Sequence, residues 1–249
     1  MKLSLILGLV LITFYGFGQQ QIAVSKSASG IDKITMDFKY PELITLSAWD
    51  KNEVSISGKA KINNGENDEA FKLNVEDVDG QLKISSLIEN IESLPKRIVI
   101  RRGGIDYFFP TDNIDDPEVR QFLANGDHQY QTYGVIKEIT LDIKVPRNIA
   151  IELNAKYGLV EVIDLDNPLV VDAKYGGADV SFSPNSPRNI KAKTKFGEMF
   201  SDLDMTINTD KSDHGQYFKW TTISAQLAGG GTSCILESKY GNLYLRKNK

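Results

Sequence analysis

A tripeptide of Lys, an aromatic residue and Gly occurs four times in the second half of the chain. The copies are Lys156-Tyr157-Gly158, Lys174-Tyr175-Gly176, Lys195-Phe196-Gly197 and Lys239-Tyr240-Gly241. Successive aromatic residues stand 18, 21 and 44 positions apart. Such a repeat predicts stacked copies of one supersecondary unit, because a single unit cannot bury its apolar face alone. The first two spacings each fit one coil of a β-solenoid, and the third fits two coils or one coil with an insertion.

The residues before each tripeptide alternate between apolar and polar, as expected of a half-buried strand. The positions six, four and two before each aromatic residue are apolar or small, and they are Ile151, Leu153, Ala155, Leu169, Val171, Ala173, Ile190, Ala192, Thr194, Cys234, Leu236 and Ser238. The alternation resumes after the glycine, for example with Val160 and Val162. Each copy therefore predicts a strand, a tight turn that needs the conformational freedom of glycine, and a second strand. The aromatic rings are expected to form a column, either as buried rungs or as an outward-facing binding stripe.

The rest of the chain also favours strands. Residues 43–48 and 53–58, and residues 71–75 and 81–84, predict pairs of strands joined by turns, and residues 139–145 predict a further strand. The fold class is therefore all-β, in a single parallel β-helix or β-solenoid-like domain. Two segments, about 103–134 and 208–231, interrupt the strand–turn–strand pattern and are expected to be irregular insertions. Within the first, Asp116, Pro117 and Gly126 predict the N-cap, first turn and end of one short helix.

Aromatic residues are enriched in the first insertion. We take Tyr107, Phe108, Phe109, Tyr130 and Tyr133 as candidate binding residues, because aromatic side chains dominate many interaction hot spots. The alternative is that they cover an open side of the solenoid. The same two interpretations apply to Tyr217, Phe218 and Trp220 in the second insertion.

Residues 1–18 resemble a secretory signal peptide. Lys2 precedes an apolar run over residues 3–12, and the small residues Gly16 and Gly18 follow. The run is short for a membrane span, which needs about 20 residues. We therefore expect residues 19–249 to be exported to the periplasm, the outer envelope or the exterior, with no transmembrane segment after cleavage.

Several classes of chemistry lack a sequence signal. The single cysteine, Cys234, falls in an inward column and is expected to be buried packing. The two histidines, His128 and His214, are far apart, and the acidic residues near Asp115 lack the spacing of a calcium loop, so no metal or cofactor is expected. No nucleophile elbow or glycine-rich phosphate loop occurs. The formal net charge of −4 gives no support to nucleic-acid binding.

The segment Val145-Pro146-Arg147-Asn148, followed by the repeated turns, resembles the putative adhesin family of exported bacterial domains. Residues 48–58 resemble an early segment of the same family. The resemblance covers about residues 30–249 without the two insertions, and it implies a right-handed β-helix-like solenoid. It brings no catalytic residues. Relatives place Ser-Gly or Thr-Gly at the corners, where this chain has Lys-aromatic-Gly.

The sequence therefore predicts a non-catalytic, adhesin-like interaction module of the cell envelope or surface, with an envelope protein or a glycan as partner. Its oligomeric state is left open. A row of Lys156, Lys174 and Lys195 would attract acidic polysaccharide or lipid phosphate, or would serve only for solubility beside Asp172 and Glu237. The alternative functions are a polysaccharide-processing enzyme, which needs paired carboxylates on this scaffold, and a purely structural periplasmic protein.

Overall fold

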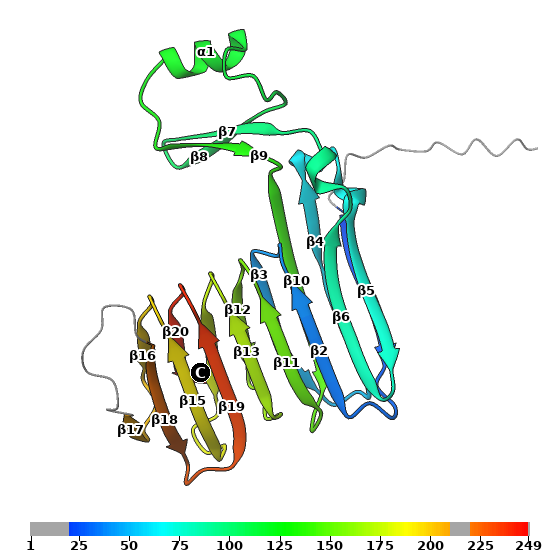
Figure 1. Cartoon of the computed structure of the whole chain (residues 1–249), viewed down its shortest axis with the longest axis vertical. Coiled ribbons are helices and arrows are strands. Elements are labelled where there is room, and N and C mark those ends of the chain that lie inside the picture. Colours follow the sequence, from blue (N-terminus) through cyan, green and yellow to red (C-terminus); the bar gives the residue numbers. More distant parts are fainter. Residues whose placement is uncertain (1–19, 210–219, 249) are drawn as a thin grey trace, which may run out of the picture.

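The computed structural model describes residues 20–209 and 220–248, so the predicted signal peptide, Tyr217 and Phe218 lie outside the described residues. The chain is mostly β, with two large sheets facing each other and a third, small sheet beyond one end of their strands (Figure 1). The strands are β1 (Gln20–Ser27), β2 (Lys33–Phe38), β3 (Leu43–Trp49), β4 (Glu53–Ile62), β5 (Phe71–Val78), β6 (Gln81–Ile88), β7 (Arg97–Arg102), β8 (Ile105–Phe109), β9 (Tyr130–Gly134), β10 (Lys137–Pro146), β11 (Ala150–Ala155), β12 (Leu159–Ile163), β13 (Leu169–Ala173), β14 (Ala178–Phe182), β15 (Arg188–Thr194), β16 (Met199–Ser201), β17 (Met205–Thr209), β18 (Thr221–Leu227), β19 (Thr232–Ser238) and β20 (Leu243–Lys247). The helices are α1 (Pro117–Ala124) and the 3₁₀ turns Asn63–Gly65, Asp68–Ala70 and Ile91–Ser93.

Sheet A has the strand order β1-β4-β10-β3-β12-β14-β20-β16, and sheet B has the order β17-β18-β15-β19-β13-β11-β2-β6-β5. Five units cross from a strand of sheet B to a strand of sheet A, namely β2–β3, β11–β12, β13–β14, β15–β16 and β19–β20. Neighbouring units pair in parallel in both sheets, for example Leu153 with Val171 and Val162 with Val180. The predicted strand–turn–strand unit is therefore present in the structure.

The all-β class is confirmed, but the sheets are mixed, whereas the sequence predicts a parallel β-helix. The pairs β1–β4, β4–β10, β5–β6, β15–β18 and β17–β18 are antiparallel. The β5–β6 hairpin shows the physical reason, because Asp79 and Gly80 both have positive φ and return the chain directly alongside itself. Antiparallel pairs flank the parallel centre at both ends of sheet B and at the β1 end of sheet A. The right-handed winding stays a prediction.

The predicted inward columns are confirmed as the core between the two sheets. All twelve side chains six, four and two positions before the repeated aromatic residues are at most 2% exposed. Cys234 is among them, and burial raises the pKa of its thiol to about 12. The alternation therefore identified the buried face because strand side chains point to opposite faces in turn.

The units do not stack in the order of the chain. β19 lies between β13 and β15 in sheet B, and β20 lies between β14 and β16 in sheet A. Between Phe196 and Tyr240 the described residues form β16, β17, β18 and β19, with residues 210–219 outside the described part. The strands β17 and β18 are therefore an insertion between β16 and β19, and the described residues of this stretch contain no additional strand–turn–strand unit.

The described parts of the two segments expected to be irregular contain regular structure. β7, β8 and β9 form an antiparallel sheet C, and α1 follows β8 and packs against it. This unit has its own apolar cluster of Ile98, Ile100, Phe109 and Val119. The helix begins as predicted, with the Asp116 carboxylate accepting the Glu118 N–H at 2.9 Å. In the second segment, β18 extends sheet B by pairing with β15.

Candidate functional site

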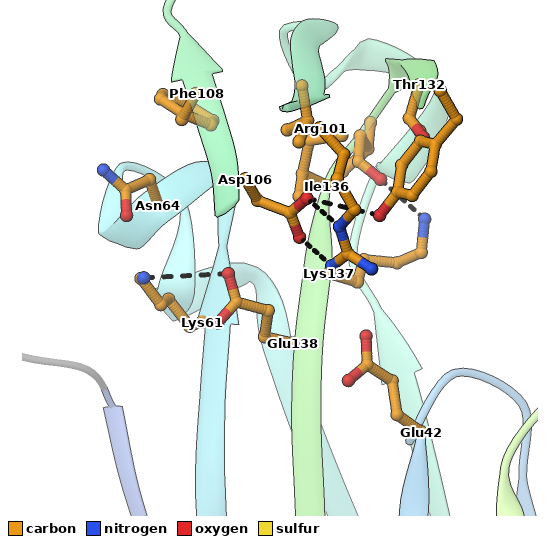
Figure 2. Close-up of a pocket in the computed structure, with 13 residues that line it drawn as sticks. Glu42, Lys61, Asn64, Arg101, Asp106, Phe108, Thr132, Ile136, Lys137 and Glu138 are labelled. Atoms are coloured by element: carbon orange, nitrogen blue, oxygen red, sulfur yellow. Dashed lines mark hydrogen bonds and ion pairs between the residues drawn. The ribbon is translucent and has the colours of Figure 1, made fainter. Parts of the chain in front are cut away.

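A hollow of about 660 Å³ lies between sheet C and the neighbouring end of sheet A, and we call it the junction hollow (Figure 2). It is lined by Glu42, Lys61, Asn64, Val99, Arg101, Asp106, Phe108, Tyr130, Thr132, Val135, Ile136, Lys137 and Glu138. Strands β7, β8 and β9 contribute four charged or aromatic side chains, namely Arg101, Asp106, Phe108 and Tyr130. The charged side chains opposite them come from β4, β10 and the turn before β3.

Sheet C divides the five predicted aromatic residues between its two faces. Tyr107 and Phe109 lie 4.7 and 5.4 Å from the Phe122 ring of α1, measured between ring centroids. Tyr133 pairs with the buried Ile98 on the same face and is 54% exposed. Phe108 and Tyr130 line the junction hollow on the opposite face. The structure therefore brings two of the five candidates together in one site.

The wall beside Tyr130 is an ion pair. The Arg101 guanidinium donates to both oxygens of Asp106 at 2.6 and 2.5 Å, and it lies 4.9 Å from the centre of the Tyr130 ring. The Tyr130 hydroxyl donates to the same carboxylate at 3.3 Å. Hydrogen bonds from Arg101 lower the pKa of Asp106. These contacts fix the orientation of three side chains that face the junction hollow.

The opposite wall carries carboxylates and lysines. Lys61 lies 3.7 Å from Glu138, and the Lys137 ammonium donates to the carbonyl of Val135 at 2.6 Å. The Glu42 carboxylate, by contrast, has no ion pair or hydrogen bond within the described residues, and Figure 2 shows it facing the hollow. Burial, and then the neighbouring Glu138, raise the pKa of Glu42. Burial lowers the pKa of Lys137.

The charged residues of the junction hollow carry no motif. Arg101 and Asp106 are five positions apart, and the register of the β7–β8 hairpin places them opposite each other. Glu42 and Glu138 are almost a hundred positions apart and meet only because β3 and β10 are parallel neighbours. The apolar residues 98–100 between Arg97 and Arg101 were the available signal for sheet C, and this run was too short to separate a strand from a loop.

The repeated tripeptides form a second surface feature, which we call the corner ladder: Lys156–Tyr157, Lys174–Tyr175, Lys239–Tyr240 and Lys195–Phe196, in spatial order. The ring centroids of neighbours are 5.3, 4.9 and 5.1 Å apart, with interplanar angles of 20°, 2° and 14°. The expected column of stacked rings is confirmed. The four rings are 41–50% exposed, so the column lies on the surface and is not a set of buried rungs.

The glycines of the corner ladder are needed for close approach and not for a left-handed conformation. A Cβ atom on Gly176 would lie 2.1 Å from the carbonyl oxygen of Gly158, and one on Gly197 would lie 2.0 Å from that of Gly241. None of the four glycines has a positive φ. The sequence analysis explained these glycines by their conformational freedom, and that explanation was wrong. Glycine is needed because the stacked corner backbones leave no room for a side chain.

A fifth copy of the corner was not found from the sequence. Lys39, Tyr40 and Pro41 occupy the equivalent positions after β2, because Phe38 pairs with Ala155. Proline replaces the glycine there, which hid the repeat. Tyr40 is half-buried against the core, and the Lys39 ammonium lies 4.7 Å from the centre of its ring. The Lys137 ammonium of the junction hollow lies 5.9 Å from the same centre, so the two surface features adjoin at Tyr40.

Within residues 20–209 and 220–248, no group of three or more His, Cys, Asp or Glu side chains is arranged to hold a metal ion. In the same part of the chain, no helix combines the length and the apolar character that a membrane crossing requires.

No family model and no curated protein matches this chain. Two crystal structures are similar to it, each with 11% sequence identity. One is described as a putative cell adhesion protein from Clostridium sporogenes, with a TM-score of 0.45 over 93% of this chain and 100% of that one. The other is described as a putative adhesin from Bacteroides fragilis, with a TM-score of 0.28 over 92% of this chain and 97% of that one.

Proposed function

We propose that the protein is a non-catalytic, exported interaction module of the cell envelope or surface, adhesin-like in function, which binds the carbohydrate of a glycan in the junction hollow. The stacked units form a short solenoid that holds sheet C at the end of β4 and β10. The single observation that carries the proposal is the junction hollow itself, in which Phe108 and Tyr130 lie beside the Arg101–Asp106 pair.

The lining of the junction hollow suits a sugar. A sugar residue presents apolar C–H groups on its faces and hydroxyl groups around its edge, and binding sites of this kind combine aromatic surface with a few oriented polar groups. Phe108 and Tyr130 supply the aromatic surface. Arg101 and Asp106 hold each other in place, so they offer hydrogen-bonding atoms without further ordering of the side chains.

The proposal is tested by binding of residues 19–249 to a glycan array, followed by titration of the best glycan against two single variants. Tyr130→Ala removes a ring from the junction hollow and is expected to weaken binding by about tenfold or more. Tyr133→Ala removes a ring of similar exposure from the opposite face of the same strand and serves as the matched control. Equal affinities of the two variants would place the binding site elsewhere.

A glycan-processing enzyme is the second candidate, and Glu42 is the observation that favours it. The Glu42 carboxyl has a raised pKa and shares the hollow with Glu138, the combination that a general acid requires beside an ionised partner. Incubation of the wild type and Glu42→Gln with polysaccharides, followed by an assay for new reducing ends, separates the two functions. Product formed by the wild type and lost in Glu42→Gln would replace the non-catalytic proposal.

A further inference from the structure

The corner ladder carries a row of lysines that make no ion pair within the described residues, although Asp37 and Asp172 lie near Lys156 and Lys174. The backbones of neighbouring corners lie in contact, at about the 4.8 Å spacing of adjacent strands. Lys156, Lys174, Lys239 and Lys195 therefore follow each other in register, and none of them makes an ion pair within the described residues. Like charges side by side repel each other, so an anion along the row would relieve a cost that the folded chain bears.

The rings add to this preference for an anion. Tyr175 and Tyr240 each have both faces covered by neighbouring rings, so only their edges and hydroxyl groups reach solvent. The edge of an aromatic ring is the positive part of its quadrupole. Each lysine ammonium lies 5.1–5.3 Å from the centre of its own ring. The ladder therefore offers a line of ammonium groups, ring edges and hydroxyls, and its two inner rings leave no free face for a neutral sugar.

The polar side chains of β13 and β19 form a column on sheet B next to the corner ladder, and this column limits the shape of ligand that the ladder can bind. Asp172 and Glu237 lie there, and Glu237 pairs with Lys193 at 3.0 Å. Burial and the adjacent Glu237 raise the pKa of Asp172. Acidic groups alongside the row repel an anionic surface that extends to both sides of it. The corner ladder thus favours a linear polyanion over a flat bilayer of anionic lipids.

We propose that the corner ladder binds a linear acidic polysaccharide, with carboxylates of successive sugars lying against Lys156, Lys174, Lys239 and Lys195. One sugar of an extended chain is about as long as the spacing between neighbouring strands, about 4.8 Å, so one sugar corresponds to one unit of the fold. The site is separate from the junction hollow, and its occupation does not depend on what the hollow binds.

The test measures binding of residues 19–249 to polygalacturonate oligomers of increasing length, by calorimetry at low salt. Affinity is expected to rise up to about four or five sugars, the extent of the row, and then to level off. The double variant Lys174→Gln/Lys239→Gln is expected to bind about tenfold more weakly, since two unpaired charges are lost. Lys83→Gln/Lys191→Gln, which changes the same net charge at exposed sites of β6 and β15, is the matched control and is expected to bind as the wild type does.

Asp172→Asn is expected to change the affinity for the oligomers in the opposite direction. It removes the acid beside Lys174, which would repel an anionic ligand, and is expected to strengthen binding of the oligomers by a fewfold. Equal weakening by the two lysine double variants would overturn the proposal, because binding would then depend on net charge alone. Binding to phosphatidylglycerol vesicles with none to polygalacturonate would also overturn it and would assign the ladder to a membrane surface. Tyr130→Ala leaves oligomer binding unchanged, which distinguishes this site from the junction hollow.

Discussion

Gly176→Ala tests whether the corners stack as closely as the structure shows. The added Cβ would lie 2.1 Å from the carbonyl oxygen of Gly158, 2.3 Å from its carbonyl carbon and 2.6 Å from the Leu159 nitrogen. All three atoms belong to the backbone, so no side chain can rotate away. Relief requires the β11–β12 and β13–β14 units to separate at the corner, where the Tyr175 N–H donates to the Lys156 carbonyl at 3.1 Å. Overpacking costs about 1–3 kcal/mol and the strained hydrogen bond about 1 kcal/mol more, so we expect a loss of about 3 kcal/mol.

Gly30→Ala is the control for this substitution. Gly30 has a φ of +77° and no atom within 4 Å of the position of a Cβ, so the change carries only the conformational cost, about 1–2 kcal/mol. Urea unfolding followed by circular dichroism measures both losses, and thermal unfolding should show about 2–4 °C per kcal/mol for a chain of this size. A Gly176→Ala variant no less stable than Gly30→Ala would refute the argument that close approach fixes glycine at the corners.

Three further substitutions or conditions follow from the packing. Tyr175→Ala should lower the free energy of unfolding by only about 1–2 kcal/mol, because the ring is 41% exposed and loses stacking more than burial; a loss of about 4 kcal/mol in urea unfolding would contradict this. Arg188→Met should cost about 3–5 kcal/mol by the same measurement, because the guanidinium is 1% exposed and donates to the carbonyls of Leu165 and Asn167 and to Asp166. Because the pKa of Cys234 is raised to about 12 from 9.0, its contribution to stability is intact below pH 9 and falls by about 1.4 kcal/mol per pH unit above it; Cys234→Ala should flatten that slope, and an unchanged slope would show that another group is responsible.

The buried columns were predictable because they depend on local alternation alone. Leu153, Val171 and Leu236 stand at fixed positions relative to their turns, and any stacking of the units buries them. The start of α1 was predictable for the same reason, since Asp116 and Pro117 act within one turn. Each of these features is decided by residues close together in the sequence.

The orientation of the aromatic residues depends on where each strand ends. Tyr157 and Tyr175 have the parity of the inward columns, and a longer strand would have buried them. β11 and β13 end at Ala155 and Ala173, and the chain bends before the ring. In the β19–β20 unit a hydroxyl group supports that bend: Ser238 donates to the Ala173 carbonyl at 2.7 Å and accepts the Gly241 N–H at 2.9 Å. Because of this bend, a side chain at an inward position of the alternation faces solvent. The alternation in the sequence does not show where the chain bends.

The junction hollow was not predictable, because its lining comes from separate strands whose pairing is long-range. Phe108 and Phe109 are adjacent in the sequence, yet one lines the hollow and the other packs near Phe122. Only the register of β8 against β7 decides which is which. Counting aromatic residues therefore located the right segment without distinguishing its two faces.

The last unit, β19–β20, lies between other units of the stack, so the fold depends on its C-terminal strands. Consecutive elements are usually neighbours in space, so the last unit of a stack is expected to be its outer cap. Here β18 pairs with the outer side of β15, and β19 then pairs with its inner side, between β15 and β13. Cys234, fully buried near the end of the chain, reflects this interior position. Because β19 pairs with both β13 and β15, the unit β15–β16 reaches its native position in the stack only with residues 232–247 in place. The stack is therefore not built one unit at a time from the N-terminus, and its C-terminal strands belong to the centre of the fold.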